Sequence, residues 1–278
     1  MIRLCLRSCL LLFSIALPAH ASLPLASNVP GGVTLIPLGT VVENAQPPQA
    51  WLGEQPILVT ADKGKWFAVV GLPLDMKPGL HTLHTKTREE STAVAFKVKA
   101  KKYPEQHITL KDKGKVQLSP EDEARALGEI ALIKQLKLHW QPSPDTDTAF
   151  ILPAQGRLSG RFGSRRILNG QPRAPHAGID VAVRSGTKVV ASSHANVLAV
   201  GDYFFNGKTV FLDHGNGLIT MYCHLDSIDV SADDVVHKGQ QIGLSGQTGR
   251  ATGPHLHWSV ILNGAMVNPK LFLSRQAK

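Results

Sequence analysis

The feature that most constrains the fold is the regular alternation of short apolar runs and turn signals between about residues 150 and 272. Three of the turns contain an Asn-Gly pair, which is typical of tight hairpins between antiparallel neighbours. These pairs are Asn206-Gly207, Asn216-Gly217 and Asn263-Gly264. The β-rich runs between the turns span residues 188–191, 197–203, 209–213, 218–224, 240–244 and 255–262. This half is therefore predicted to be an antiparallel sheet with little helix.

The first part of the chain shows the same kind of alternation on a smaller scale. Its β-rich runs span residues 32–38, 56–60, 66–71 and 91–99, separated by Gly, Pro and Asp-Lys-Gly. Together the two halves predict a mainly β protein: an antiparallel sheet domain at residues 150–278, preceded by a small β-rich domain at residues 22–105. No internal repeat is present, which argues against a solenoid or a propeller.

One helix is predicted between the two domains. Ser119 is a good N-cap, Pro120 suits the first helical position, and acids at residues 121–123 face the positive end of the helix dipole. A buried face is predicted from the apolar residues Leu127, Ile130, Ala131, Leu132, Ile133 and Leu136. A proline-rich stretch at residues 140–148 follows, so residues 106–149 are assigned to a helix and linker.

Residues 1–21 have the pattern of a secretory signal peptide. Arg3 and Arg7 are the only charges, an apolar run covers residues 10–17, and Ala19-His20-Ala21 fits the cleavage rule. The apolar run is short for a membrane helix and nothing later is longer, so an exported, soluble protein without stable membrane insertion is expected. Export would leave Cys223 as the one remaining cysteine, so no internal disulfide is expected.

The chain is basic, with a formal net charge of +9 that falls to +7 without the two signal arginines. Such a balance suits an anionic polymer, which leaves nucleic acid, a membrane surface or cell wall as partners. Export argues against nucleic acid. Charge alone fits a merely soluble surface equally well, so it does not decide the function.

Two histidine patterns in the second half suggest a metal site. His176 and Asp180 are four residues apart, but Gly178 between them disfavours a helix, so a loop and strand must bring them together. His255 and His257 are separated by one residue, and in a strand such residues point to the same face. Either pattern alone also fits structural or solvated side chains.

Taken together, these residues fit a catalytic zinc site. Two imidazoles and one carboxylate leave a fourth tetrahedral position for water. Calcium and magnesium prefer a larger number of oxygen ligands, so zinc is the predicted cofactor. Further histidines in the set could take the proton of the attacking water or donate to the developing oxyanion.

The full motif set resembles the lysostaphin-like M23 (LytM-type) family of peptidoglycan metallopeptidases over about residues 150–272. The motifs are Gly160-Arg161-Phe162-Gly163-Ser164-Arg165, His176-x-x-x-Asp180, Tyr222-x-His224-Leu225 and His255-Leu-His257, in the family's order. The resemblance implies that His176, Asp180 and His257 bind zinc. It also implies that His224 and His255 are catalytic and act on the water and the transition state.

The stretch at residues 169–176 is similar to the periplasmic endopeptidases of this family from Gram-negative bacteria. The resemblance implies a periplasmic location and, as substrate, the peptide stems of peptidoglycan, cut at the D-alanyl to meso-diaminopimelate cross-bridge. It names no adaptor protein. The β-rich N-terminal domain resembles, more loosely, the module that precedes such catalytic domains. Its role could be to bind the wall, to cover the groove or to stabilise the fold, and the sequence leaves these three roles open.

Three other interpretations compete with the enzyme. A non-catalytic LytM-type regulator that activates another wall hydrolase would lack ligands, whereas all five positions are filled here. A structural zinc protein would close all four positions, usually with thiolates. A latent enzyme could place His139 or Asp145 of the linker on the open zinc position. Cys223 is expected to point away from the site as a buried, inert thiol.

Overall fold

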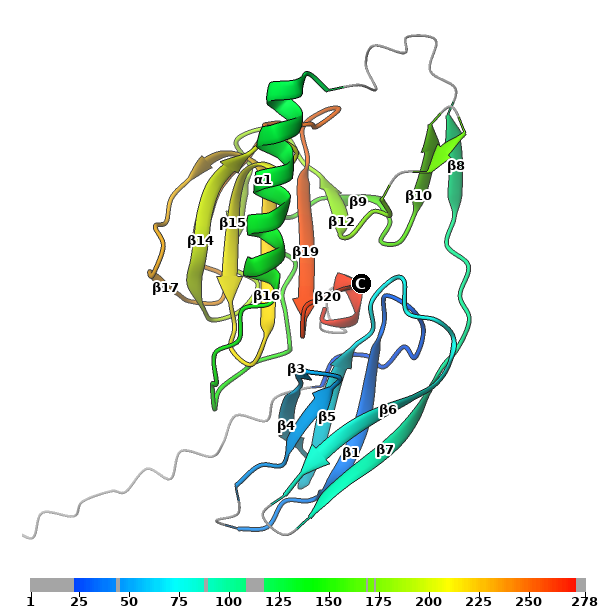
Figure 1. Ribbon diagram of the computed structural model, residues 1–278. Coiled ribbons are helices and arrows are strands. Elements are labelled where there is room, and N and C mark those ends of the chain that lie inside the picture. Colours follow the sequence, from blue (N-terminus) through cyan, green and yellow to red (C-terminus); the bar gives the residue numbers. More distant parts are fainter. Residues whose placement is uncertain are drawn as a thin grey trace, which may run out of the picture.

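A computed structural model describes residues 23–43, 46–87, 90–108, 118–168, 170–172 and 174–273. The predicted signal peptide lies outside the described residues. Within them the fold is mainly β, with two small N-terminal sheets, one long helix and a large antiparallel sheet, which confirms the predicted fold class (Figure 1). None of the helices in this described part is long and apolar enough to cross a membrane.

The N-terminal part consists of two facing antiparallel sheets. One has the order β1-β5-β4, from β1 (Val33–Thr40), β5 (Lys65–Gly71) and β4 (Leu58–Asp62). The other has the order β3-β2-β6-β7, from β3 (Gln55–Pro56), β2 (Gln49–Leu52), β6 (Gly79–Lys86) and β7 (Ser91–Val98). Their inner faces share a buried apolar cluster that includes Ile36, Val70, Leu83 and Phe96.

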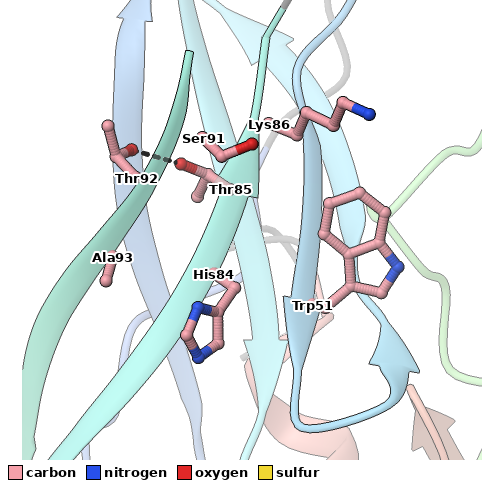
Figure 2. Close-up of a pocket in the computed structure, with 7 residues that line it drawn as sticks. All are labelled: Trp51, His84, Thr85, Lys86, Ser91, Thr92 and Ala93. Atoms are coloured by element: carbon pink, nitrogen blue, oxygen red, sulfur yellow. Dashed lines mark hydrogen bonds between the residues drawn. The ribbon is translucent and has the colours of Figure 1, made fainter.

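The outer face of the four-stranded sheet is open to solvent. Along β6, exposed residues alternate with more buried ones, as expected for a strand with one face on the core. Trp51 on β2 lies directly opposite His84 on β6, and His84 lies opposite Ala93 on β7 (Figure 2). This face therefore carries a tryptophan in the middle of a polar sheet surface.

Helix α1 (Pro120–Lys137) has the predicted cap, because the Ser119 side chain accepts a hydrogen bond from the backbone NH of Asp122. The predicted wide buried face is wrong. Only Ala126 and Ile133 are buried, whereas four of the other predicted positions remain exposed: Ala131, Leu127 at 61%, Ile130 at 51% and Leu132 at 45%. The helix contacts the sheet along a narrow line, where Ile133 packs on an apolar cluster.

The large sheet has the order β17-β14-β15-β16-β19-β12-β9, with β13, β18 and β20 paired beside this path. Its strands are β9 (Arg157–Gly160), β12 (Ile179–Ala182), β13 (Lys188–Val190), β14 (Ala195–Tyr203), β15 (Gly207–Asp213), β16 (Leu218–Ile228), β17 (Val235–Val236), β18 (Gln241–Ser245), β19 (Leu256–Leu262) and β20 (Ala265–Val267). All their pairings are antiparallel, and the three Asn-Gly pairs lie where β14–β15, β15–β16 and β19–β20 are joined. A short 3-10 helix, η2 (Pro269–Leu271), follows β20.

The two halves of the chain share one core. Val33, Leu58 and Val69 from the first half belong to the same buried cluster as Leu262 and Phe272 from the second. The backbone NH of Gly71 donates to Oδ1 of Asn263 (2.8 Å), and Nδ2 of Asn263 donates to the Gly71 carbonyl (3.2 Å). A further small sheet pairs β8 (Glu105–Ile108) in parallel with β10 (Arg165–Leu168), which in turn pairs with β11 (Gln171–Pro172).

Candidate metal centre and imidazole pair

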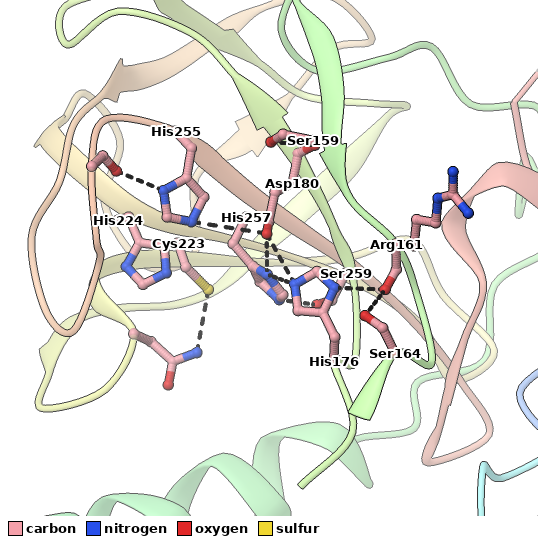
Figure 3. Close-up of polar contacts among 12 residues, drawn as sticks. Ser159, Arg161, Ser164, His176, Asp180, Cys223, His224, His255, His257 and Ser259 are labelled. Atoms are coloured by element: carbon pink, nitrogen blue, oxygen red, sulfur yellow. Dashed lines mark hydrogen bonds and ion pairs between the residues drawn. The ribbon is translucent and has the colours of Figure 1, made fainter. Parts of the chain in front are cut away.

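Three of the predicted site residues meet where strands β12 and β19 lie side by side. Asp180 is directly opposite His257 across these strands, and His176 lies in the loop just before β12. Nε2 of His176 is 3.0 Å from Oδ1 of Asp180 and 3.0 Å from Nδ1 of His257, and Nδ1 of His257 is 2.9 Å from Oδ1 of Asp180 (Figure 3). A loop and a strand thus bring His176 and Asp180 together, as expected from the glycine at position 178 between them.

Each ring is held from behind by a second hydrogen bond. Nδ1 of His176 donates to the backbone carbonyl of Arg161 (3.0 Å), and Nε2 of His257 lies 2.9 Å from the hydroxyl of Ser259. These contacts turn Nε2 of His176 and Nδ1 of His257 toward Asp180. Metal-binding histidines usually have such a partner on the other ring nitrogen, because it fixes the orientation and tautomer of the ring.

The electrostatics favour an ionised Asp180 carboxylate beside a neutral His257 ring. Burial by itself raises the pKa of Asp180, but hydrogen bonds and charge interactions with His176 and His257 are stronger and lower it well below its usual range. Burial lowers the pKa of His257, although Asp180 partly opposes this shift. Neutral imidazoles and a carboxylate are the protonation states that a divalent metal requires.

The donor atoms fit a tetrahedral ion. Zinc with bonds of about 2.0–2.1 Å places its ligand atoms roughly 3.3 Å apart, close to the spacings of 2.9–3.0 Å seen here. Among the described residues, His176, Asp180 and His257 form the one group of three or more potential metal ligands this close together. Two nitrogens and one oxygen suit zinc better than calcium or magnesium.

Two glycines leave room for this arrangement. A Cβ atom on Gly160 would lie 2.1 Å from Oδ2 of Asp180, because the two residues are paired across β9 and β12. A Cβ atom on Gly178 would lie 2.6 Å from the hydroxyl of Ser259 and 2.7 Å from Nε2 of His257. Any larger residue at either position would displace a member of the candidate centre.

The two other predicted site residues, His224 and His255, form a pair beside the three donors. Their ring centroids are 4.7 Å apart, and Nε2 of His255 lies 3.8 Å from Oδ1 of Asp180. Nδ1 of His224 donates to the carbonyl of Thr248 (2.8 Å), and Nδ1 of His255 donates to the carbonyl of Gly253 (2.8 Å). Both Nε2 atoms are therefore the ones left unprotonated in the neutral rings. Burial lowers the pKa of His224 to about 4, so this ring is neutral at pH 7.

Tyr222 of the Tyr-x-His-Leu motif lies outside the site. It is fully buried, and its hydroxyl bonds to Ser192 and Thr220 inside the core. Cys223 is buried as predicted, and burial raises the pKa of its thiol to about 11. The expected direction of Cys223 is wrong, because it lies opposite His257 across β16 and β19, and directly opposed residues share a face.

The linker residues considered as latent zinc ligands lie elsewhere. Nε2 of His139 is 3.2 Å from Oδ2 of Asp213, and the backbone NH of Asp145 bonds to the hydroxyl of Ser143. Neither side chain belongs to the group of potential ligands. The structure therefore contradicts the latent arrangement built on these two residues.

The structure adds supporting groups that the motif analysis missed. The hydroxyl of Ser259 and the carbonyls of Arg161, Thr248 and Gly253 orient the four rings. Ser259 was open to prediction, because it follows His257 by two residues on the same strand face. The three carbonyls could not be predicted from the sequence, because only the folded chain brings a residue such as Thr248 next to His224.

Fold and site together define a class: a mainly β protein in which neighbouring strands hold a His-Asp-His donor set beside a pair of imidazoles. Comparison with protein families gives matches to peptidase family M23 over residues 174–269 and to the peptidase family M23 N-terminal domain over residues 26–101. A crystal structure from Pseudomonas aeruginosa, provisionally assigned to peptidase M23, is 39% identical with a TM-score of 0.75, and the match covers 89% of this chain and 96% of that one. The chain belongs to peptidase family M23.

Two named relatives each match less than half of the chain. The peptidoglycan DD-endopeptidase ShyA of Vibrio cholerae is 43% identical over 120 residues, which is 43% of this chain and 28% of ShyA. The DD-carboxypeptidase/endopeptidase Mpg of Neisseria meningitidis is 40% identical over 113 residues, which is 41% of this chain and 26% of Mpg. The match thus spans little more than a quarter of the length of either relative.

Proposed function

We propose that this chain is a zinc metalloendopeptidase that hydrolyses the peptide cross-bridges of peptidoglycan. The observation that carries the proposal is the set of three donor atoms 2.9–3.0 Å apart next to two anchored imidazoles. His176, Asp180 and His257 would hold the metal and leave one tetrahedral position open. When bound, zinc supplies Lewis acidity that activates water for attack on an amide.

The imidazole pair would move the protons. Because His224 and His255 each donate Nδ1–H to a backbone carbonyl, their Nε2 atoms are available to accept a proton from the attacking water. The lowered pKa of His224 keeps that ring neutral at pH 7 and ready to act as a base. Once protonated, either ring is a donor for the developing oxyanion or for the amine that leaves.

The substrate proposal rests on the relatives and on the sequence. Since ShyA and Mpg are named for DD-endopeptidase activity, we propose the D-alanyl to meso-diaminopimelate bond as the one cleaved. Peptidoglycan peptide stems carry carboxylates, and a net charge of +7 without the two signal arginines, from +9 for the full sequence, suits an anionic partner. The predicted signal sequence supports a periplasmic location, in which these stems are accessible.

The test uses the purified mature chain loaded with zinc and cross-linked muropeptide dimers of the diaminopimelate type. We expect dimers to be converted to monomers, with a mass that identifies the cleaved bond. His255→Ala is the matched control, because it removes an imidazole that is not a proposed metal ligand. Zinc binding without cleavage would reject the enzyme and favour the regulator of another wall hydrolase.

A further inference from the structure

The outer face of the four-stranded N-terminal sheet contains a hollow that the proposed hydrolysis does not use. A shallow cavity of about 250 Å³ lies there, and its walls come from β2, β6 and β7 (Figure 2). It is lined by Trp51, His84, Thr85, Lys86, Ser91, Thr92 and Ala93. From the chemistry of this lining we infer that the hollow binds a carboxylate-bearing glycan strand, an inference that rests on the proposed cell-wall function.

The first step of the argument is the position of Trp51. This indole is partly buried in the middle of a sheet face, directly opposite His84, rather than at the tip of a loop. Ala93 continues the same row on β7, so a small side chain borders the hollow on the far side. A flat aromatic surface next to small residues suits the C–H face of a pyranose ring, and exposed aromatic rings also serve as stacking platforms for nucleic-acid bases.

The second step is the charge of the face. Strands β2, β6 and β7 contain no Asp or Glu, whereas Lys86 and Lys97 are exposed on the outward side. Lys86 lies in the next row after His84 and directly opposite Ser91, so an ammonium and a hydroxyl border the hollow together. Carboxylates on a sugar strand would complement this end of the cavity, while the opposite end stays apolar.

The third step is the rigidity of the support. Beneath the hollow, the hydroxyls of Thr85 and Thr92 are 2.7 Å apart and bridge β6 and β7. Ala50, paired with Thr85, is buried in the core between the two sheets. Sites built on packed strands lose little conformational freedom when a ligand binds, and an extended polymer can lie across a face of this kind. A shallow strand face favours a chain-like glycan over a membrane surface, which would engage protruding residues.

The experiment uses the full mature chain and three probes in calorimetric titrations. The probes are peptide-free wall glycan strands with free lactyl carboxylates, uncharged chitohexaose, and phosphatidylglycerol vesicles. We expect saturable binding to both sugars, with Trp51→Ala weakening it by about tenfold, the effect of losing one stacking platform. Lys86→Glu should weaken binding to the carboxylated strand and leave chitohexaose unaffected. Leu80→Ala, a residue 76% exposed on the same face but outside the hollow, is the matched control.

Several results would overturn the inference. These are absence of saturable sugar binding by the wild type, equal affinities of Trp51→Ala and the wild type, or Trp51-dependent binding to the vesicles alone. If Trp51→Ala does not fold, Trp51→Tyr, which keeps an aromatic face, should bind sugar and Lys86→Glu still tests the charge. Hydrolysis of soluble muropeptide dimers should be unchanged in all these variants. Failure of the wild type to cleave dimers, with glycan binding intact, would instead reject the proposed enzyme.

Discussion

Removing the hydroxyl behind His257 should weaken metal binding without dismantling the site. Ser259 is fully buried, and its hydroxyl lies 2.9 Å from Nε2 of His257. In Ser259→Ala this ring nitrogen loses its partner in a place where water cannot replace it. Loss of such a supporting contact typically costs about 10–100-fold in metal affinity, equivalent to about 1.4–2.7 kcal/mol. The ring also becomes free to turn Nδ1 away from Asp180.

The assay is competition for zinc between the protein and a chromophoric chelator, which reads the affinity directly. Ser245→Ala is the matched control, because Ser245 is also fully buried, and its hydroxyl bonds to the carbonyl of Arg184 (2.7 Å) and the NH of Thr187 (3.2 Å) instead. Both variants should lose similar stability, but only Ser259→Ala should lose zinc affinity. An unchanged affinity in Ser259→Ala, or an equal loss in the control, would refute the role given to this hydroxyl.

Three further predictions address the metal site, the core and the helix. Gly160→Ala should purify without zinc, measured by elemental analysis with circular dichroism as the check on folding, because its Cβ would lie 2.1 Å from Oδ2 of Asp180. Burial lowers the pKa of His214 to about 4. The unfolded chain therefore binds more protons than the folded chain between about pH 6.5 and pH 4, and the free energy of unfolding should fall by up to about 3 kcal/mol as the pH drops through this window. Denaturant titrations at several pH values would show this fall, and His214→Gln should remove the His214 share of it, while the similarly lowered pKa of His224 leaves a second share in place. Ile133→Ala, in the buried line of the helix, should lower the free energy of unfolding by about 2–4 kcal/mol, whereas Leu127→Ala should change it by less than about 0.5 kcal/mol in the same titration.

Local sequence patterns predicted the strands of the large sheet well, because two of the signals used, the Asn-Gly turns and the His-x-His spacing, involve residues close together in the chain. The Asn-Gly pairs mark hairpins within a few residues, and the His-x-His spacing already places His255 and His257 near one another. Strand order is a different matter. Asp180 is paired with His257, 77 residues later, and no local period contains that neighbour. The motif set of a known family supplied this link at the sequence level.

The helix shows the limit of apolar periodicity. The apolar residues of α1 predicted a broad buried stripe, yet Leu127 and Leu132 stay exposed, and the burial centres on Ile133. The width of a buried face depends on the shape of the surface that the helix meets. Here polar contacts share the docking: Glu129 accepts from the NH of Phe204 (2.6 Å), and Arg125 donates to the carbonyl of Asp202 (3.1 Å). None of these partners is within the helix sequence.

The alternation rule failed at His224, and the failure has a physical cause. Leu225 follows Tyr222 by three residues on β16, whereas their partners on β15, Lys208 and Val210, are only two residues apart. Strand β16 therefore has a bulge at this point. His224 has a φ of 62° and its NH bonds to the carbonyl of Asn206 (2.8 Å). A non-glycine residue in this region costs of order 1–3 kcal/mol, and such strain persists only where the surroundings hold it. The bulge carries the ring of His224 to within 4.7 Å of His255 while Cys223 stays in the core. In a regular strand the alternation would continue, and the ring of His224 would point to the opposite face, away from His255. The strained residue is therefore the one whose displaced side chain the proposed chemistry requires.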